Sequence, residues 1–152
     1  MALSTGKRPL FETVNTKTKV ISGLGATATL SIDQTGSTVL LDRAAGIIVT
    51  LPLAVPGLIY DFKANVSVTT NNYKVITGAA TEFLVGGVSQ NAAALAVFSG
   101  NGSTHIAVTM NGTTTGGLAG TALRFTCLST TRWMVEGINI ASGTGVTPFA
   151  AS

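Results

Sequence analysis

Short runs in which apolar and polar residues alternate with period two recur along most of this chain. The runs ATATLSID, THIAVTM and LRFTC show this alternation, which is typical of β-strands because successive strand residues point to opposite faces of a sheet. Turn-forming pairs such as Thr35-Gly36, Pro56-Gly57 and Asn101-Gly102 separate the runs, at a spacing of roughly 8–12 residues. The pattern predicts an all-β chain folded as one antiparallel β-sandwich or β-barrel, jelly-roll-like in character.

The alternation also predicts the individual strands and the core. The run SQNAAALAVF (89–98) is the one place where a helix could form, but its β surroundings favour a strand. Strands are expected over residues 26–33, 37–42, 46–51, 58–64, 65–70, 73–77, 93–99, 104–110, 123–127 and 132–140. Their apolar positions predict a core of Ile47, Val49, Leu51, Leu58, Tyr60, Phe62, Val75, Ile106, Val108, Leu123, Phe125, Trp133 and Val135.

Charge is scarce and unevenly distributed. Only 10% of the residues are charged, against roughly 25% in ordinary soluble domains, which fits either a Thr/Ser-covered β protein or a surface covered by other subunits. The whole excess of positive charge lies in the first twenty residues, where Lys7, Arg8, Lys17 and Lys19 face Glu12 alone. We therefore expect a basic N-terminal arm (1–25), which binds a partner with these four residues together with Pro9 and Phe11.

The rest of the chain is expected to form one unit. Residues 26–152 would be a single β domain, with a Gly/Thr-rich loop (109–122) and a short C-terminal tail (141–152). The loop is long for a hairpin, and a neighbouring subunit could be what orders it. The tail ends in Pro148 and Phe149 behind a Gly/Ser/Thr spacer. Two alternatives remain open for Phe149, which either folds back into its own domain or docks with Pro148 on a neighbouring subunit.

The residue types needed for catalysis or metal binding are rare. The chain has one histidine, His105, and one cysteine, Cys127, which is too few for a zinc site or an intrachain disulfide. The acidic residues are isolated from one another, and no glycine-rich phosphate loop is present. We expect no catalytic residue, no metal and no cofactor, so the chain is not expected to be an enzyme.

Targeting, membrane and nucleic-acid roles are not favoured either. Pro52 and Pro56 interrupt the longest apolar stretch (44–60), so it predicts strands around a turn and no membrane helix. The first nineteen residues lack the apolar core of a signal peptide, so secretion by a signal peptide is not expected. Four dispersed basic residues without interleaved aromatics do not indicate a nucleic-acid partner.

Several motifs in a fixed order resemble small virion proteins of tailed bacteriophages, especially cyanophages and other marine phages. They are A-G-x-x-V-T-L-P and G-L-x-Y-x-F within residues 40–77, M-N-G-x-T-T-G-G within 104–127, and W-x-V-x-G followed by G-T-x-x-T-P-F within 131–152. The resemblance spans most of the chain but not the first twenty-odd residues.

The resemblance implies a structural protein of the virion. It suggests a capsid decoration or cement protein, made in the host cytoplasm, that binds the major capsid protein on the outside of the head as a homotrimer. Related β domains occur in tails and fibres, so the alternative is a tail, fibre or knob module that binds a host-surface glycan or another receptor. The resemblance implies no catalytic residues, and the basic arm has no counterpart in it.

Overall fold

The computed structural model describes residues 18–152. Along the chain the elements are β1 (Val20–Ile21), β2 (Thr27–Thr29), the 3₁₀ helix η1 (Ile32–Gln34), β3 (Ser37–Leu41), β4 (Ile47–Thr50), β5 (Ile59–Ala64), β6 (Tyr73–Ile76), β7 (Phe83–Asn91), β8 (Ala96–Ser99), β9 (Ala107–Met110), β10 (Ala122–Ser129), β11 (Arg132–Ile140) and β12 (Phe149–Ala150). No helix in residues 18–152 is long and apolar enough to span a membrane.

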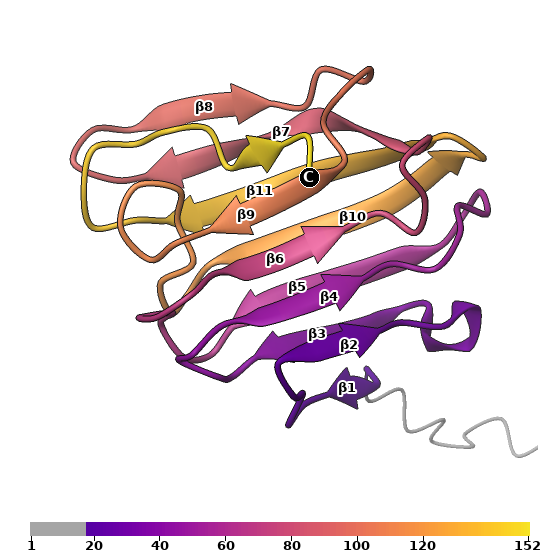
Figure 1. Ribbon diagram of the computed structural model, residues 1–152, viewed down its shortest axis with the longest axis horizontal. Coiled ribbons are helices and arrows are strands. Elements are labelled where there is room, and N and C mark those ends of the chain that lie inside the picture. Colours follow the sequence, from indigo (N-terminus) through magenta and orange to yellow (C-terminus); the bar gives the residue numbers. More distant parts are fainter. Residues whose placement is uncertain (1–17) are drawn as a thin grey trace, which may run out of the picture.

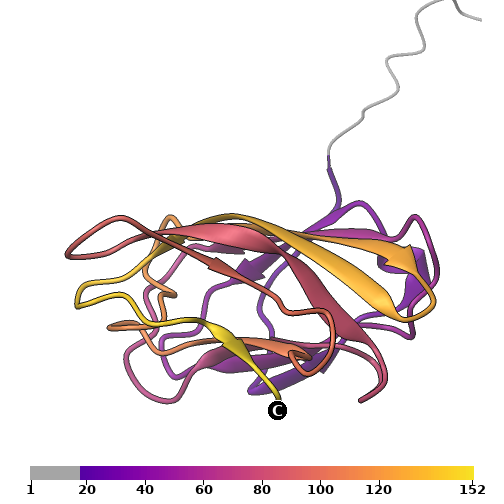
Figure 2. The same cartoon turned by 90° about the horizontal axis from the view of Figure 1, so that it is seen from above.

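The strands form two sheets that pack face to face (Figures 1 and 2). Sheet A has the strand order β1-β3-β5-β10-β11-β7-β8, and sheet B has the order β12-β9-β6-β4-β2. The predicted all-β sandwich is confirmed. It buries the apolar residues of both inner faces in one core between the layers.

Both sheets are mixed, which differs from the antiparallel arrangement expected from the sequence. From β1 to β6 the chain changes sheet at every connection, so neighbours within a sheet run parallel: β1-β3-β5 in sheet A and β2-β4-β6 in sheet B. Reversal within one sheet occurs at β7-β8 and at β10-β11. Turn residues such as Thr35-Gly36 and Pro56-Gly57 therefore carry the chain between layers, where a hairpin was the simplest expectation.

The predicted core is confirmed with one exception. Trp133, Tyr60, Phe62 and Phe125 are completely or almost completely buried; the rings of Tyr60 and Trp133 lie 6.2 Å apart, and those of Phe62 and Phe125 meet edge to face at 5.2 Å. The exception is Ile106, which lies just before β9 and is only partly buried.

The predicted strands differ from the structure in several places. The predicted strands 93–99 and 104–110 begin only at Ala96 and Ala107, and β7 begins at Phe83, in a stretch where no strand was predicted. Residues 65–70 form no strand. The N–H of Val68 donates to the carbonyl of Gly117 and that of Thr69 to the carbonyl of Ala44, so these main-chain groups bond to loops and do not join a strand ladder. The run 26–33 is divided between β2 and η1, where the side chain of Gln34 accepts a hydrogen bond from the N–H of Ser31. The ambiguous run 89–98 is strand at both ends, in β7 and β8.

Sheet A begins inside the segment expected to be an arm. Val20 and Ile21 pair with β3, and the N–H of Gly23 donates to Asp42 Oδ2 at 2.8 Å. The sandwich thus includes residues N-terminal to position 26, where the domain was expected to begin. Residues 1–17 lie outside the described part of the chain.

Candidate functional site

The outer face of sheet B carries a row of side chains contributed by four neighbouring strands. Thr27, Ile48, Lys74 and Thr109 lie opposite one another in register across β2, β4, β6 and β9. They point outward because the next residues on β4, β6 and β9 point into the core. A cleft of about 650 Å³ lies over this row.

The wall of this cleft is formed by the loop before β4 and the loop before β6, which side-chain hydrogen bonds hold in place. Arg43 Nη1 donates to the carbonyls of Ala45 at 3.3 Å and Gly46 at 2.7 Å, and Asn71 Nδ2 donates to the carbonyl of Ala45 at 3.0 Å. Gly46 has φ +84°, and a Cβ there would lie 2.6 Å from the carbonyl oxygen of Asn72. The wall is therefore built to one shape and needs glycine at position 46.

The chemistry of the cleft suits binding. Arg43 and Lys74 supply positive charge, while Ile48 and several alanines supply an apolar floor. The side chains that line the cleft include no carboxylate, histidine, cysteine or aromatic ring. Thr109 Oγ1 is inaccessible to solvent and has no hydrogen-bond partner among the described residues. Such a site can hold an extended, partly anionic chain, but its lining offers no group suited to proton transfer near neutral pH.

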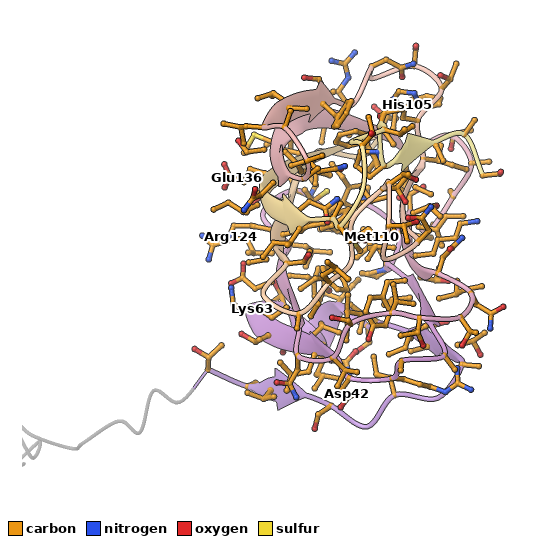
Figure 3. The ribbon with its side chains drawn as sticks, turned by 90° about the vertical axis from the view of Figure 1, so that its left-hand side faces the viewer. Asp42, Lys63, His105, Met110, Arg124 and Glu136 are labelled. Carbon is orange, nitrogen blue, oxygen red and sulfur yellow. The ribbon has the colours of Figure 1, made fainter. Side chains whose placement is uncertain are left out.

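The outer face of sheet A is charged but largely neutralises itself. Arg124 on β10 donates two hydrogen bonds to Asp61 on β5, at 2.7 and 2.9 Å, and Glu136 on β11 lies opposite Arg124 on its other side. Lys63, Arg124 and Glu136 project from this one face (Figure 3). The hydrogen bonds from Arg124 lower the pKa of Asp61, and the same contact raises the pKa of Arg124. This face thus has less uncompensated charge to offer a partner than the cleft on sheet B.

The residues expected to form the partner-binding arm are mostly outside the structure. Lys7, Arg8, Pro9, Phe11 and Lys17 precede residue 18, the first described residue. Lys19 is exposed next to β1, and its carbonyl accepts a hydrogen bond from the N–H of Thr38 at 2.8 Å. The binding role of the arm stays a prediction.

The proposed inter-subunit contact at Pro148 and Phe149 needs correction. Both residues are buried, Phe149 is only 4% exposed, and it pairs with Val108 in the β12-β9 ladder. The ring of His105 stacks on Phe149 with centroids 5.9 Å apart. Of the two alternatives open for Phe149, folding back into its own domain is the one the structure adopts, because β9 and His105 supply the surface that covers it.

The single histidine and the single cysteine have structural partners. His105 Nδ1 accepts a hydrogen bond from the N–H of Asn101, and the buried thiol of Cys127 donates to the carbonyl of Ser129. Burial raises the pKa of the Cys127 thiol, with a further contribution from Glu82, so the nucleophilic thiolate is disfavoured. Within residues 18–152 no cluster of three or more His, Cys, Asp or Glu residues could hold a metal ion.

A buried amide network was missed by the sequence reasoning. Asn139 Oδ1 accepts hydrogen bonds from the N–H of Gly117 at 3.0 Å and the hydroxyl of Thr121 at 3.3 Å, while Nδ2 donates to the carbonyl of Thr115 at 2.8 Å and to Gln90 Oε1 at 3.3 Å. This network and the side chain of Asn111, which accepts three backbone N–H bonds, hold the loop 109–122. Its own chain orders the loop, and a neighbouring subunit is not needed for this.

Comparison with known proteins identifies no relative of this chain. No protein-family model, curated protein or solved structure matches it.

Proposed function

We propose that this protein is a structural component of a phage virion, a capsid decoration or cement protein that binds the outside of the head. Its partner is the major capsid protein, and it acts as an oligomer, three copies at a three-fold position. The cleft on sheet B carries the proposal, because two cationic side chains beside an apolar floor fit an extended acidic segment of a shell protein.

The rigidity of the cleft supports this role. The side chains of Arg43 and Asn71 are already committed to the loop that they shape, so a partner meets a preformed wall and little ordering entropy is lost on binding. Several copies attached to one lattice would also gain avidity from contacts that are individually weak. The basic N-terminal segment would add electrostatic attraction to the same acidic surface.

A receptor-binding role in a tail or fibre is less well supported. Glycan sites stack sugar rings on aromatic side chains, and no aromatic ring lines the cleft. The proposal includes no catalytic step.

Sedimentation with undecorated phage heads tests the cleft. Lys74→Gln should weaken binding to heads about tenfold, because it removes one of the two cationic side chains that line the cleft. Lys63→Gln is the matched control, since Lys63 is an exposed lysine on the opposite sheet, and it should bind like the parent. If the parent protein stays in the supernatant, the cement role is wrong; if Lys74→Gln and Lys63→Gln bind alike, the cleft is not the contact.

Removal of residues 1–17 tests the arm separately. This deletion leaves β1 in place, whereas a deletion to residue 20 would remove part of the sheet A ladder. We expect the shortened protein to keep its melting temperature and to lose head binding. Binding with unchanged affinity would show that the arm is dispensable.

A further inference from the structure

Sheet A ends in an open edge strand at β8, the last strand in its order (Figure 1). In an antiparallel pair, only every second residue directs its N–H and C=O toward the neighbouring strand. The N–H of Gly100 donates to the carbonyl of Gly86, which fixes this alternation in the β7-β8 pair. The N–H and C=O of Val97 and Ser99 therefore point away from β7. Leu95 and Val97 are 76% and 68% exposed. Residues 92–99 contain no charge and no proline, although these are the residues that usually prevent an exposed edge strand from pairing with another chain.

At the opposite edge of sheet A, strand β1 also has main-chain groups that point away from the sheet. In the parallel pair β1-β3 the N–H of Thr38 donates to the carbonyl of Lys19, so Val20, which lies opposite Thr38, directs its own N–H and C=O away from the sheet. Val20 is 54% exposed. Ile21 packs against the core and Val97 lies opposite the exposed Ser89, so Val20 and Val97 both lie on the outer face of sheet A.

We propose that copies of this chain associate head to tail, with β8 of one copy pairing with β1 of the next. The relative strand directions favour this arrangement: following the ladder from β1 to β8, the two edge strands run in opposite directions. When sheet A of one copy continues into sheet A of the next copy in the same orientation, β8 and β1 therefore meet as an antiparallel pair. Val97 and Val20 of the second copy form a pair that exchanges two main-chain hydrogen bonds and places two exposed valines side by side.

The head-to-tail contact covers more of the open strand edges than a two-fold contact between two β8 strands would. A β8-β8 pair leaves the β1 edge open, whereas β8-β1 pairing covers both edges of every copy once a ring has closed. The proposal rests on the proposed function for one point only, the closure of the ring at three copies. It also places residue 18, where the chain outside the structure joins, beside the β8 strand of the neighbouring copy.

Cysteine cross-linking tests the pairing directly. Val20→Cys and Val97→Cys are made as separate proteins and oxidised alone and as a mixture, with buried Cys127 left in place. Paired strand residues lie about 5.5 Å apart at Cα, within the range of a disulfide, so the mixture should give covalent dimers and neither protein alone should. Dimers from Val97→Cys alone would show a two-fold contact, and no cross-link in any sample would show that neither edge is paired; both results overturn the proposal.

A charge at the edge gives a second, independent measurement. Val97→Lys should weaken self-association at least about tenfold by native mass spectrometry, because the lysine faces the neighbouring valine. Val146→Lys is the matched control, since Val146 is 48% exposed in the loop before β12 and lies on neither edge. Equal self-association of the two variants contradicts the proposal.

Head binding separates this inference from the proposed function. If Val97→Lys is monomeric and still binds heads weakly, the cement role and the edge contact both hold. If the parent self-associates through these edges but does not bind heads, the edge contact holds and the cement role fails. If the parent binds heads and neither cysteine variant cross-links, the cement role holds and the edge contact fails.

Discussion

The paired strands β7 and β11 have buried side chains of different chemistry at their two ends. At one end Trp133 lies opposite Leu84, and six residues further along the strand Asn139 lies opposite Gln90. All four side chains have no exposed surface. The first end is packed with rings and aliphatic chains, whereas the second is held by amide hydrogen bonds to the loop 109–122. A loop that lies against the interior has no strand ladder to satisfy its backbone, so side chains of the neighbouring strands must do so.

The aromatic end should be the more sensitive to truncation. Trp133→Ala removes the largest fully buried side chain and leaves Glu82 Oε2 without the indole N–H that donates to it at 3.1 Å. We expect a loss of about 3–5 kcal/mol in the free energy of unfolding, a large part of the stability of an ordinary domain. Urea denaturation followed by circular dichroism measures the change.

The control for this variant is Leu128→Ala, since Leu128 is 49% exposed on β10. It should change the free energy of unfolding by less than about 0.5 kcal/mol. A Trp133→Ala protein that unfolds at the same urea concentration as Leu128→Ala would contradict the central position of the ring.

The amide end should lose somewhat less stability and should lose it in a different way. Asn139→Ala leaves the N–H of Gly117 and the carbonyl of Thr115 without their partners, which should cost about 2–4 kcal/mol because buried unpaired groups keep their desolvation penalty. The amide of Gly117 should also exchange with deuterium faster than amides of β10. Asn65→Ala, at an exposed asparagine, should change neither. If global stability falls without faster exchange at Gly117, the network does not hold the loop.

The aromatic end could be predicted from the sequence and the amide end could not. Alternation places Trp133 and Val135 on one face, and both are fully buried. Continued along β11, the same alternation places Asn139 inside and Ile138 outside, which opposes the hydropathy of the two residues; Ile138 is 56% exposed. Only the loop that supplies Gly117 and Thr115 explains the inversion, and that loop is brought to β11 by the fold as a whole.

The changes from one sheet to the other between β1 and β6 could not be predicted from the sequence, for a related reason. A turn residue marks where a strand ends, but it does not tell whether the next strand joins the same sheet or the facing one. The alternation in β3, β4, β5 and β6 therefore predicts strands correctly, but it does not predict that they pair in parallel. The cleft was missed too, because Arg43 and Lys74 are isolated charges in the sequence and meet only through the parallel register of sheet B.

Glu82 is a polar group placed at the aromatic end, and it tests how strict the difference between the two ends is. Its side chain is 3% exposed and accepts hydrogen bonds from the N–H of Ala54 at 2.8 Å and from Trp133 Nε1 at 3.1 Å. Glu82→Gln keeps the size but turns an amide NH₂ toward one of these two donors, so we expect a loss of about 1–3 kcal/mol. Thermal unfolding measures it. An unchanged melting temperature would show that one of these hydrogen bonds contributes nothing.

The smallest effect concerns hydroxyl groups, and here the two ends should respond with opposite sign. Ser37 is fully buried opposite Tyr60 and its Oγ has no partner among the described residues, whereas Thr121 Oγ1 at the amide end accepts from the N–H of Ile140 at 3.0 Å and donates to Asn139. Ser37→Ala removes an unpaired polar group and should raise stability by up to about 1 kcal/mol, while Thr121→Val should lower it by about 1–2 kcal/mol. Paired urea titrations of the two variants measure both changes. Destabilisation by Ser37→Ala would mean that its hydroxyl has a partner after all, and the aromatic end would then depend on hydrogen bonds as the amide end does.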